Sequence, residues 1–70
     1  MKVRYDPEAD ILYFLIKEGE VEDTIEVDDD IFIEYGPNKE IMGIEIWQAR
    51  KNVLPQFIEY LREIQRTVSV

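Results

Sequence analysis

The sequence feature that most constrains the fold is a β-hairpin pattern in the middle of the chain. Two β-rich runs, Ile31–Tyr35 and Ile41–Trp47, flank a Gly-Pro-Asn-Lys-Glu loop of the length and composition that close antiparallel hairpins. Gly43, inside the second run, indicates a bulge or the close approach of another group. We expect a large ring, such as that of Trp47 or Phe32, to lie over this glycine.

The residues before this hairpin predict the rest of an antiparallel sheet. Lys2–Tyr5 alternates apolar and charged residues, as a half-exposed strand does. Ile11–Ile16 is apolar at every position, so this strand needs cover on both faces and is predicted to lie centrally in the sheet. Val21–Val27 carries charges that are typical of an edge strand, and Asp28–Asp30 predicts a turn or bulge before the hairpin.

The end of the chain predicts one amphipathic helix, running roughly from Val53 to Thr67. Asn52 is the expected N-cap, and Pro55 is tolerated in the first helical turn. Apolar residues recur at spacings of three and four: Leu54, Phe57, Ile58, Leu61 and Ile64. The predicted fold class is α+β, a four- to five-stranded antiparallel β-meander with one C-terminal amphipathic helix. All 70 residues form one domain, with the sheet in residues 1–49, the helix in residues 50–67 and a tail in residues 68–70.

The net charge of the chain restricts the classes of partner that it can bind. Sixteen acidic and eight basic residues give a net charge of −8. This charge argues against binding to nucleic acid and to anionic membranes, both of which require basic surface. It suits solubility or a basic protein partner. The longest apolar run is too short to span a bilayer, and the sequence begins on a strand pattern without a signal-peptide core, so we expect a cytoplasmic protein.

Several short motifs together carry a family resemblance. They are Tyr-Asp-Pro-Glu-Ala-Asp at residues 5–10, Leu12-Tyr13, Glu26-Val27-Asp28-Asp29, Gly43-Ile44-Glu45-Ile46 and Ala49. In these motifs the chain resembles the domain of unknown function family 2283, from the first strand to about Ala49. The resemblance implies a small β-meander protein without an assigned activity, and some relatives are suspected antitoxins. Trp47-Gln48 departs from the smaller and acidic residues of the pattern. No catalytic residue comes with the family.

The residue types present restrict the chemistry. Histidine and cysteine are absent and the one serine is Ser69, which argues against a nucleophilic triad. Asp28–Asp30, with Glu26, Glu34 or Glu45, offers oxygen ligands for Mg²⁺ or Ca²⁺. Adjacent strand residues point to opposite faces, however, so we interpret the aspartates as a solvated turn. We therefore assign no catalytic, cofactor-binding or metal-binding residue and expect no enzyme. A small ligand- or divalent-metal-binding protein that uses these carboxylates is the alternative.

Two further groups of residues have structural interpretations. Asp6 and Asp10, on either side of the first turn, are predicted to cap it with their carboxylates. The aromatic residues Tyr5, Tyr13, Tyr35 and Trp47 are interpreted as packing residues in preference to a ligand-binding patch.

The apolar surface predicts a partner. The single helix covers at most one face of a sheet that is apolar on two, and an uncovered apolar patch is a liability for a monomer. We expect a homodimer, formed by stacking the sheets or by exchanging the helices, or else a toxin partner on the same surface. The expected interface residues are Ile11, Tyr13, Leu15, Phe32, Ile41 and Trp47. The predicted function is a non-enzymatic protein-interaction module, antitoxin-like, that masks a basic partner.

Overall fold

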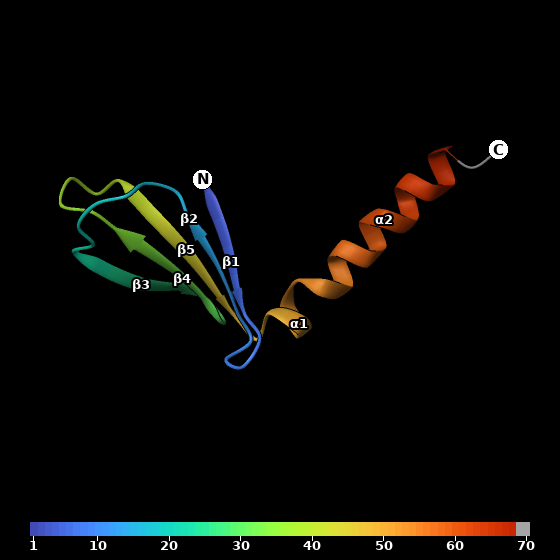
Figure 1. Ribbon diagram of the computed structural model, residues 1–70, viewed down its shortest axis with the longest axis horizontal. Helices are drawn as coiled ribbons and strands as arrows, with labels where there is room; N and C mark the ends of the chain where they lie inside the picture. The colour runs from blue at the N-terminus through green and yellow to red at the C-terminus, as the bar shows by residue number, and fades with distance from the viewer. Residues whose placement is uncertain (69–70) are drawn as a thin grey trace.

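The computed structural model describes residues 1–68 as one five-stranded antiparallel sheet followed by two helices (Figure 1). The elements are β1 (Lys2–Asp6), β2 (Ile11–Leu15), β3 (Asp23–Asp28), β4 (Ile31–Tyr35), β5 (Ile41–Trp47), α1 (Ala49–Asn52) and α2 (Leu54–Val68). The predicted fold class, an α+β antiparallel meander with a C-terminal helix, is confirmed. Of the predicted tail, Val68 belongs to α2, and Ser69 and Val70 lie outside the described residues.

The strand order in the sheet is β1-β2-β5-β4-β3. The predicted hairpin is present as β4 and β5, and β5 is the central strand because it also pairs with β2. The central position predicted for Ile11–Ile16 is confirmed only in part, since β2 lies inside the sheet between β1 and β5 but the middle strand is β5. The edge position predicted for Val21–Val27 is also confirmed, because within residues 1–68 the only strand that pairs with β3 is β4.

The strand register sorts the side chains onto two unlike faces. Paired residues of antiparallel strands lie on the same face, so the row Val3, Phe14, Ile44, Ile33 and Ile25 crosses the whole sheet on one side. A second row on the same side contains Tyr5, Leu12, Ile46 and Ile31. We call this side the apolar face. The opposite side, here the mixed face, combines aromatic and apolar residues with Arg4, Glu34 and Glu45.

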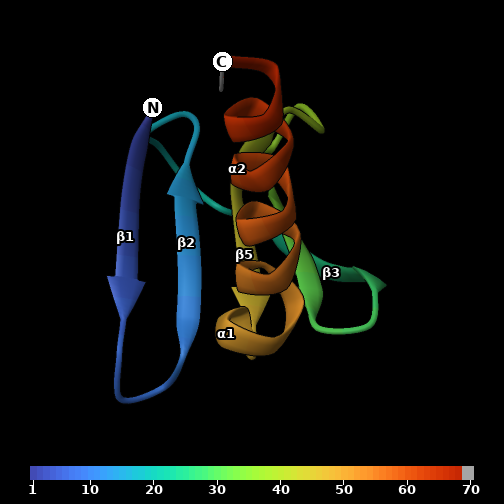
Figure 2. The same ribbon diagram turned by 90° about the vertical axis from the view of Figure 1, so that its right-hand side faces the viewer.

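The helix does not cover the sheet. Within residues 1–68, α2 packs against α1 and makes no extended contact with any strand. Figure 1 shows α2 leaving the sheet at an angle, and Figure 2 shows it standing in front of β5. The radius of gyration is 15.0 Å, whereas a compact domain of this length has about 11 Å. The sequence left open whether the helix packs on its own sheet or on that of a neighbour, and within residues 1–68 it covers neither face of its own sheet.

The helical region also begins earlier than its sequence pattern predicts. Gln48 has a left-handed backbone (φ 49) and is followed at once by α1. Asn52 is not an N-cap, because it ends α1 and its side-chain amide donates to the Trp47 carbonyl at 2.7 Å. Pro55 has no amide hydrogen to donate back to α1, so α1 and α2 do not form one continuous helix.

Little of this chain is buried. Among the described apolar side chains, Met42 and Ala49 alone fall in the buried class, with 2% and 6% of their surfaces exposed. On the apolar face, by contrast, Val3 is 54% and Ile25 is 49% exposed. The sheet therefore has an apolar side without a covering layer. In the part of the chain that the structure describes, no helix is both long and apolar enough to cross a membrane.

Candidate functional site

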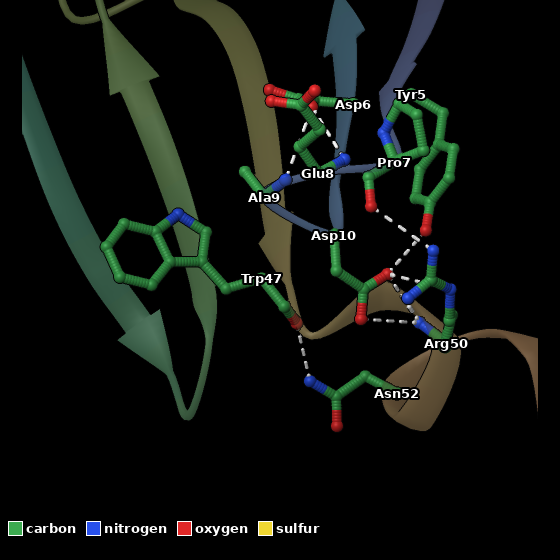
Figure 3. A network of polar contacts seen from close by, with 9 residues as sticks. All are labelled: Tyr5, Asp6, Pro7, Glu8, Ala9, Asp10, Trp47, Arg50 and Asn52. Carbon is green, nitrogen blue, oxygen red and sulfur yellow. Dashed lines mark hydrogen bonds and ion pairs between the residues drawn. The ribbon is translucent and has the colours of Figure 1, made fainter.

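The helical region is fixed to the sheet first through Asp10 (Figure 3). Asp10 precedes β2 and has a left-handed backbone (φ 56). Its carboxylate accepts hydrogen bonds from the Tyr5 hydroxyl at 2.6 Å and from the Arg50 amide at 3.2 Å. The Arg50 guanidinium lies 3.9 Å from the same carboxylate and also donates to the Pro7 carbonyl. The Asp10 carbonyl accepts from the Ala49 amide at 3.0 Å, so backbone and side chain both hold the start of α1.

Asp30 forms a matching attachment on the other side of β5. It precedes β4 and also has a left-handed backbone (φ 62). Its carboxylate accepts from the side-chain amides of Gln48 at 3.0 Å and Asn52 at 3.2 Å, and its carbonyl accepts from the Trp47 amide at 2.8 Å. We call Asp10 and Asp30 with these partners the aspartate anchors. They attach α1 to both neighbours of β5 and so fix the direction in which α2 leaves.

The turn between β1 and β2 agrees in part with its prediction. The Asp6 carboxylate accepts from the amides of Glu8 at 3.0 Å and Ala9 at 3.2 Å, which confirms that Asp6 caps the turn. Asp10 bonds across the molecule to Tyr5 and Arg50, so a turn cap does not describe its role. The bond to Asp10 raises the pKa of the Tyr5 hydroxyl, because a nearby carboxylate favours the neutral phenol.

The mixed face contains a polar pair above Gly43. The Tyr13 hydroxyl donates to the Glu34 carboxylate at 2.5 Å, and this bond, aided by burial, raises the pKa of Tyr13 to about 12. A Cβ atom on Gly43 would lie 2.6 Å from the Tyr13 hydroxyl, so the predicted close approach is confirmed. The ring that approaches is that of Tyr13, whereas we expected Trp47 or Phe32.

The six predicted interface residues have mixed surroundings. By register, all except Ile41 lie on the mixed face: Ile11, Tyr13, Leu15, Phe32 and Trp47. Ile41 follows a register shift, and it is 41% exposed. The rings of Phe32 and Trp47 pack at 4.9 Å, and the Trp47 indole donates to Glu45. Figure 3 shows Trp47 pointing away from Arg50 and α1. The predicted interface residues other than Ile41 therefore lie on the opposite side of the sheet from the apolar face.

The acidic turn does not gather its three carboxylates. The Asp28 carboxylate accepts from the Asp29 amide at 2.8 Å, while the Asp30 carboxylate is engaged by Gln48 and Asn52. Within residues 1–68, no group of three acidic side chains has a geometry suited to holding a metal ion. The turn and anchor contacts account for Asp28 and Asp30 without a bound cation.

The second exposed apolar surface is on α2. We call it the helix stripe, and it consists of Leu54, Phe57, Ile58, Leu61 and Ile64, which are 42–54% exposed. Leu54 lines a hollow together with Tyr5 of the apolar face and Val53. The stripe therefore begins on the side of α2 that is turned toward the apolar face. The sheet and α2 diverge from α1, with an open angle between them (Figure 1).

Charge is divided between the sheet and the helices. Residues 1–48 hold fourteen of the sixteen acidic residues and four of the eight basic residues, a net charge of −10. Residues 49–70 hold the remaining two acidic and four basic residues, a net charge of +2. The basic residues are Arg50, Lys51, Arg62 and Arg66, of which the last two lie within 4 Å of Glu59. The protein thus joins an acidic sheet to a weakly basic helical region.

Sequence reasoning missed the aspartate anchors and took both faces of the sheet to be apolar. Asp10 and Arg50 are 40 positions apart, so no local pattern links them. The sequence signal that could have revealed the anchors is an aspartate placed directly before each of the two strands that flank β5, Asp10 before β2 and Asp30 before β4. The mixed face was taken to be apolar because Tyr13 and Trp47 were counted as apolar residues, although each uses its polar atom on this face.

The comparisons with known proteins identify one family. The family described as "Protein of unknown function (DUF2283)" matches residues 2–50. That region contains the whole sheet and ends at Arg50, so it includes both ends of the contact between Asp10 and Arg50. No curated protein and no solved structure matches the chain. The chain belongs to the DUF2283 family, and α2 extends beyond the matched region.

Proposed function

We propose that the protein is a non-enzymatic protein-interaction module that works as a homodimer. The observation that carries this proposal is the pair of exposed apolar surfaces, the apolar face and the helix stripe. Patches of this kind on small proteins mark interaction sites, because leaving them in water is unfavourable. A second copy of the chain provides a matching surface by two-fold symmetry.

We further propose that the dimer presents the acidic surface of its sheets to a basic protein partner and masks it, as an antitoxin does. The net charge of −10 in residues 1–48 supports this part of the proposal. Complementary charge speeds association and favours partners of the opposite sign. Because such attraction is screened by salt, binding of the partner is expected to weaken as ionic strength rises.

Two measurements test the proposal. Light scattering on the purified chain is expected to give twice its 8.4 kDa mass. Coexpression with the product of the adjacent gene is expected to yield a complex that dissociates in high salt. A single-chain mass at high concentration would remove the homodimer. An adjacent product that neither copurifies nor binds in low salt would remove the antitoxin-like role.

A further inference from the structure

We propose that the homodimer is built by helix exchange: α2 of each copy enters the open angle of the other copy and covers its apolar face. This inference rests on the proposed homodimer and specifies its interface. In this dimer the helix stripe of a second copy packs on the apolar face. The contact is reciprocal, because each copy supplies one apolar face and one α2.

The aspartate anchors explain why α2 does not cover its own sheet. Asp10 and Asp30 hold α1 from two sides through side-chain and backbone hydrogen bonds. Ala49, at the start of α1, is buried against the end of the sheet. Folding α2 down onto its own apolar face would either break the contacts between α1 and α2 or require α1 to rotate and the anchor bonds to break. The same anchors leave the apolar face open to a helix from outside.

The two surfaces match in length. α2 has 15 residues, which at the rise of an α-helix is about 22 Å. The central strand β5 has seven residues, which at the rise of a β-strand is about 23 Å. One α2 therefore spans the apolar face along β5 from end to end.

The exposed area matches that of a dimer interface. The chain exposes 5678 Å², whereas a folded monomer of its mass exposes about 4,600 Å². The excess is about 1,100 Å², and a standard interface buries about 800 Å² on each partner. Helix exchange would bury the helix stripe and the apolar face of both copies.

The distribution of charge also favours packing the helix of the second copy, and not its sheet, on the apolar face. Stacking two sheets would bring together two regions of charge −10 and would leave both helix stripes in water. Helix exchange brings the helical region of one copy, with charge +2, onto the acidic sheet of the other. The structure thus favours helix exchange over sheet stacking.

The direct test is an isotope-filtered NOE experiment on the full chain, with labelled and unlabelled copies mixed. We expect intermolecular contacts from Phe57, Leu61 and Ile64 of one copy to Ile33 and Ile44 of the other. Intermolecular contacts between sheets alone would overturn helix exchange while leaving the homodimer standing. A single-chain mass with no intermolecular contact would overturn helix exchange and the homodimer together.

A matched pair of variants provides a second test. Leu61→Glu places a charge in the helix stripe, while Gln56→Glu adds the same charge on the polar side of α2. Sedimentation equilibrium is expected to show a dimer dissociation constant raised at least about tenfold for Leu61→Glu and nearly unchanged for Gln56→Glu. Equal dissociation constants for the two variants would overturn the proposal. If Leu61→Glu does not fold, the NOE experiment on the unmodified chain still decides.

Discussion

At the scale of single residues, Asp10 is the side chain on which the placement of the helices depends most. It receives bonds from Tyr5 and Arg50, and 23% of its side-chain surface is exposed. Hydrogen bonds to a charged group contribute more than those between neutral groups. The left-handed backbone at Asp10 adds a preference for Asp or Asn over other residues that carry a Cβ atom.

Replacement of Asp10 is therefore expected to destabilise the fold. Asp10→Ala should lower the free energy of unfolding by about 1–3 kcal/mol, and Asp10→Asn by less because Asn tolerates the left-handed backbone. Urea unfolding, carried out at the same protein concentration for each variant, measures both changes in the free energy of unfolding. Asp29→Ala is the control, since its side chain makes no hydrogen bond within residues 1–68. Equal midpoints for Asp10→Ala and Asp29→Ala would contradict this role.

Tyr13 gives a prediction about pH at the same scale. Its bond to Glu34 raises its pKa from 10.0 to about 12, so folding favours the neutral phenol. The resulting stabilisation is complete below about pH 10, the unfolded pKa, and is lost as pH rises through 12. Phenolate absorbance should show a tyrosine titrating near pH 12 that Tyr13→Phe removes and Glu34→Gln shifts to lower pH. Glu20→Gln is the control, and a similar shift in that variant would count against the assignment.

At the scale of elements, α2 depends on contacts that its own chain does not supply. It packs against α1 and makes no extended contact with a strand of the described chain. An isolated helix of 15 residues is only marginally stable in water. Its order in solution is therefore expected to come from a partner.

Dilution should melt α2 before the sheet. As the dimer dissociates, the helical circular dichroism signal at 222 nm is expected to fall while Trp47 fluorescence, which reports on the sheet, stays constant. Gln56→Glu should follow the unmodified protein, and Leu61→Glu should lose the helical signal at higher concentration. A helical signal independent of concentration across the dissociation range would show that α2 is stable without a partner.

A strand or helix was predictable from the sequence where a pattern of neighbouring residues determines it. The hairpin β4–β5 follows from its turn, the interior position of β2 from its continuous apolar run, and the edge position of β3 from its charges. The strand order was not predictable, because the pairing of β2 with β5 joins distant segments. The short helix α1 was also missed, since Asp10 and Asp30 fix it through long-range bonds.

At the scale of the whole molecule, the elongated shape and the uneven distribution of charge both follow from the separation of the sheet from the helical region. An acidic sheet with one uncovered apolar face and a weakly basic helical region extend from a common junction at α1. The principal extents of 51 × 23 × 20 Å describe a chain far from compact. Helix exchange would turn two elongated chains into one compact particle with its apolar surfaces inside and its acidic surfaces outside.

The most direct test of this account is the mass of the full chain by sedimentation equilibrium over a wide range of concentration. We predict a particle of twice 8.4 kDa at high concentration that dissociates on dilution. A mass of 8.4 kDa at every concentration would contradict the account, because the apolar face and the helix stripe would then remain exposed without a second copy to cover them.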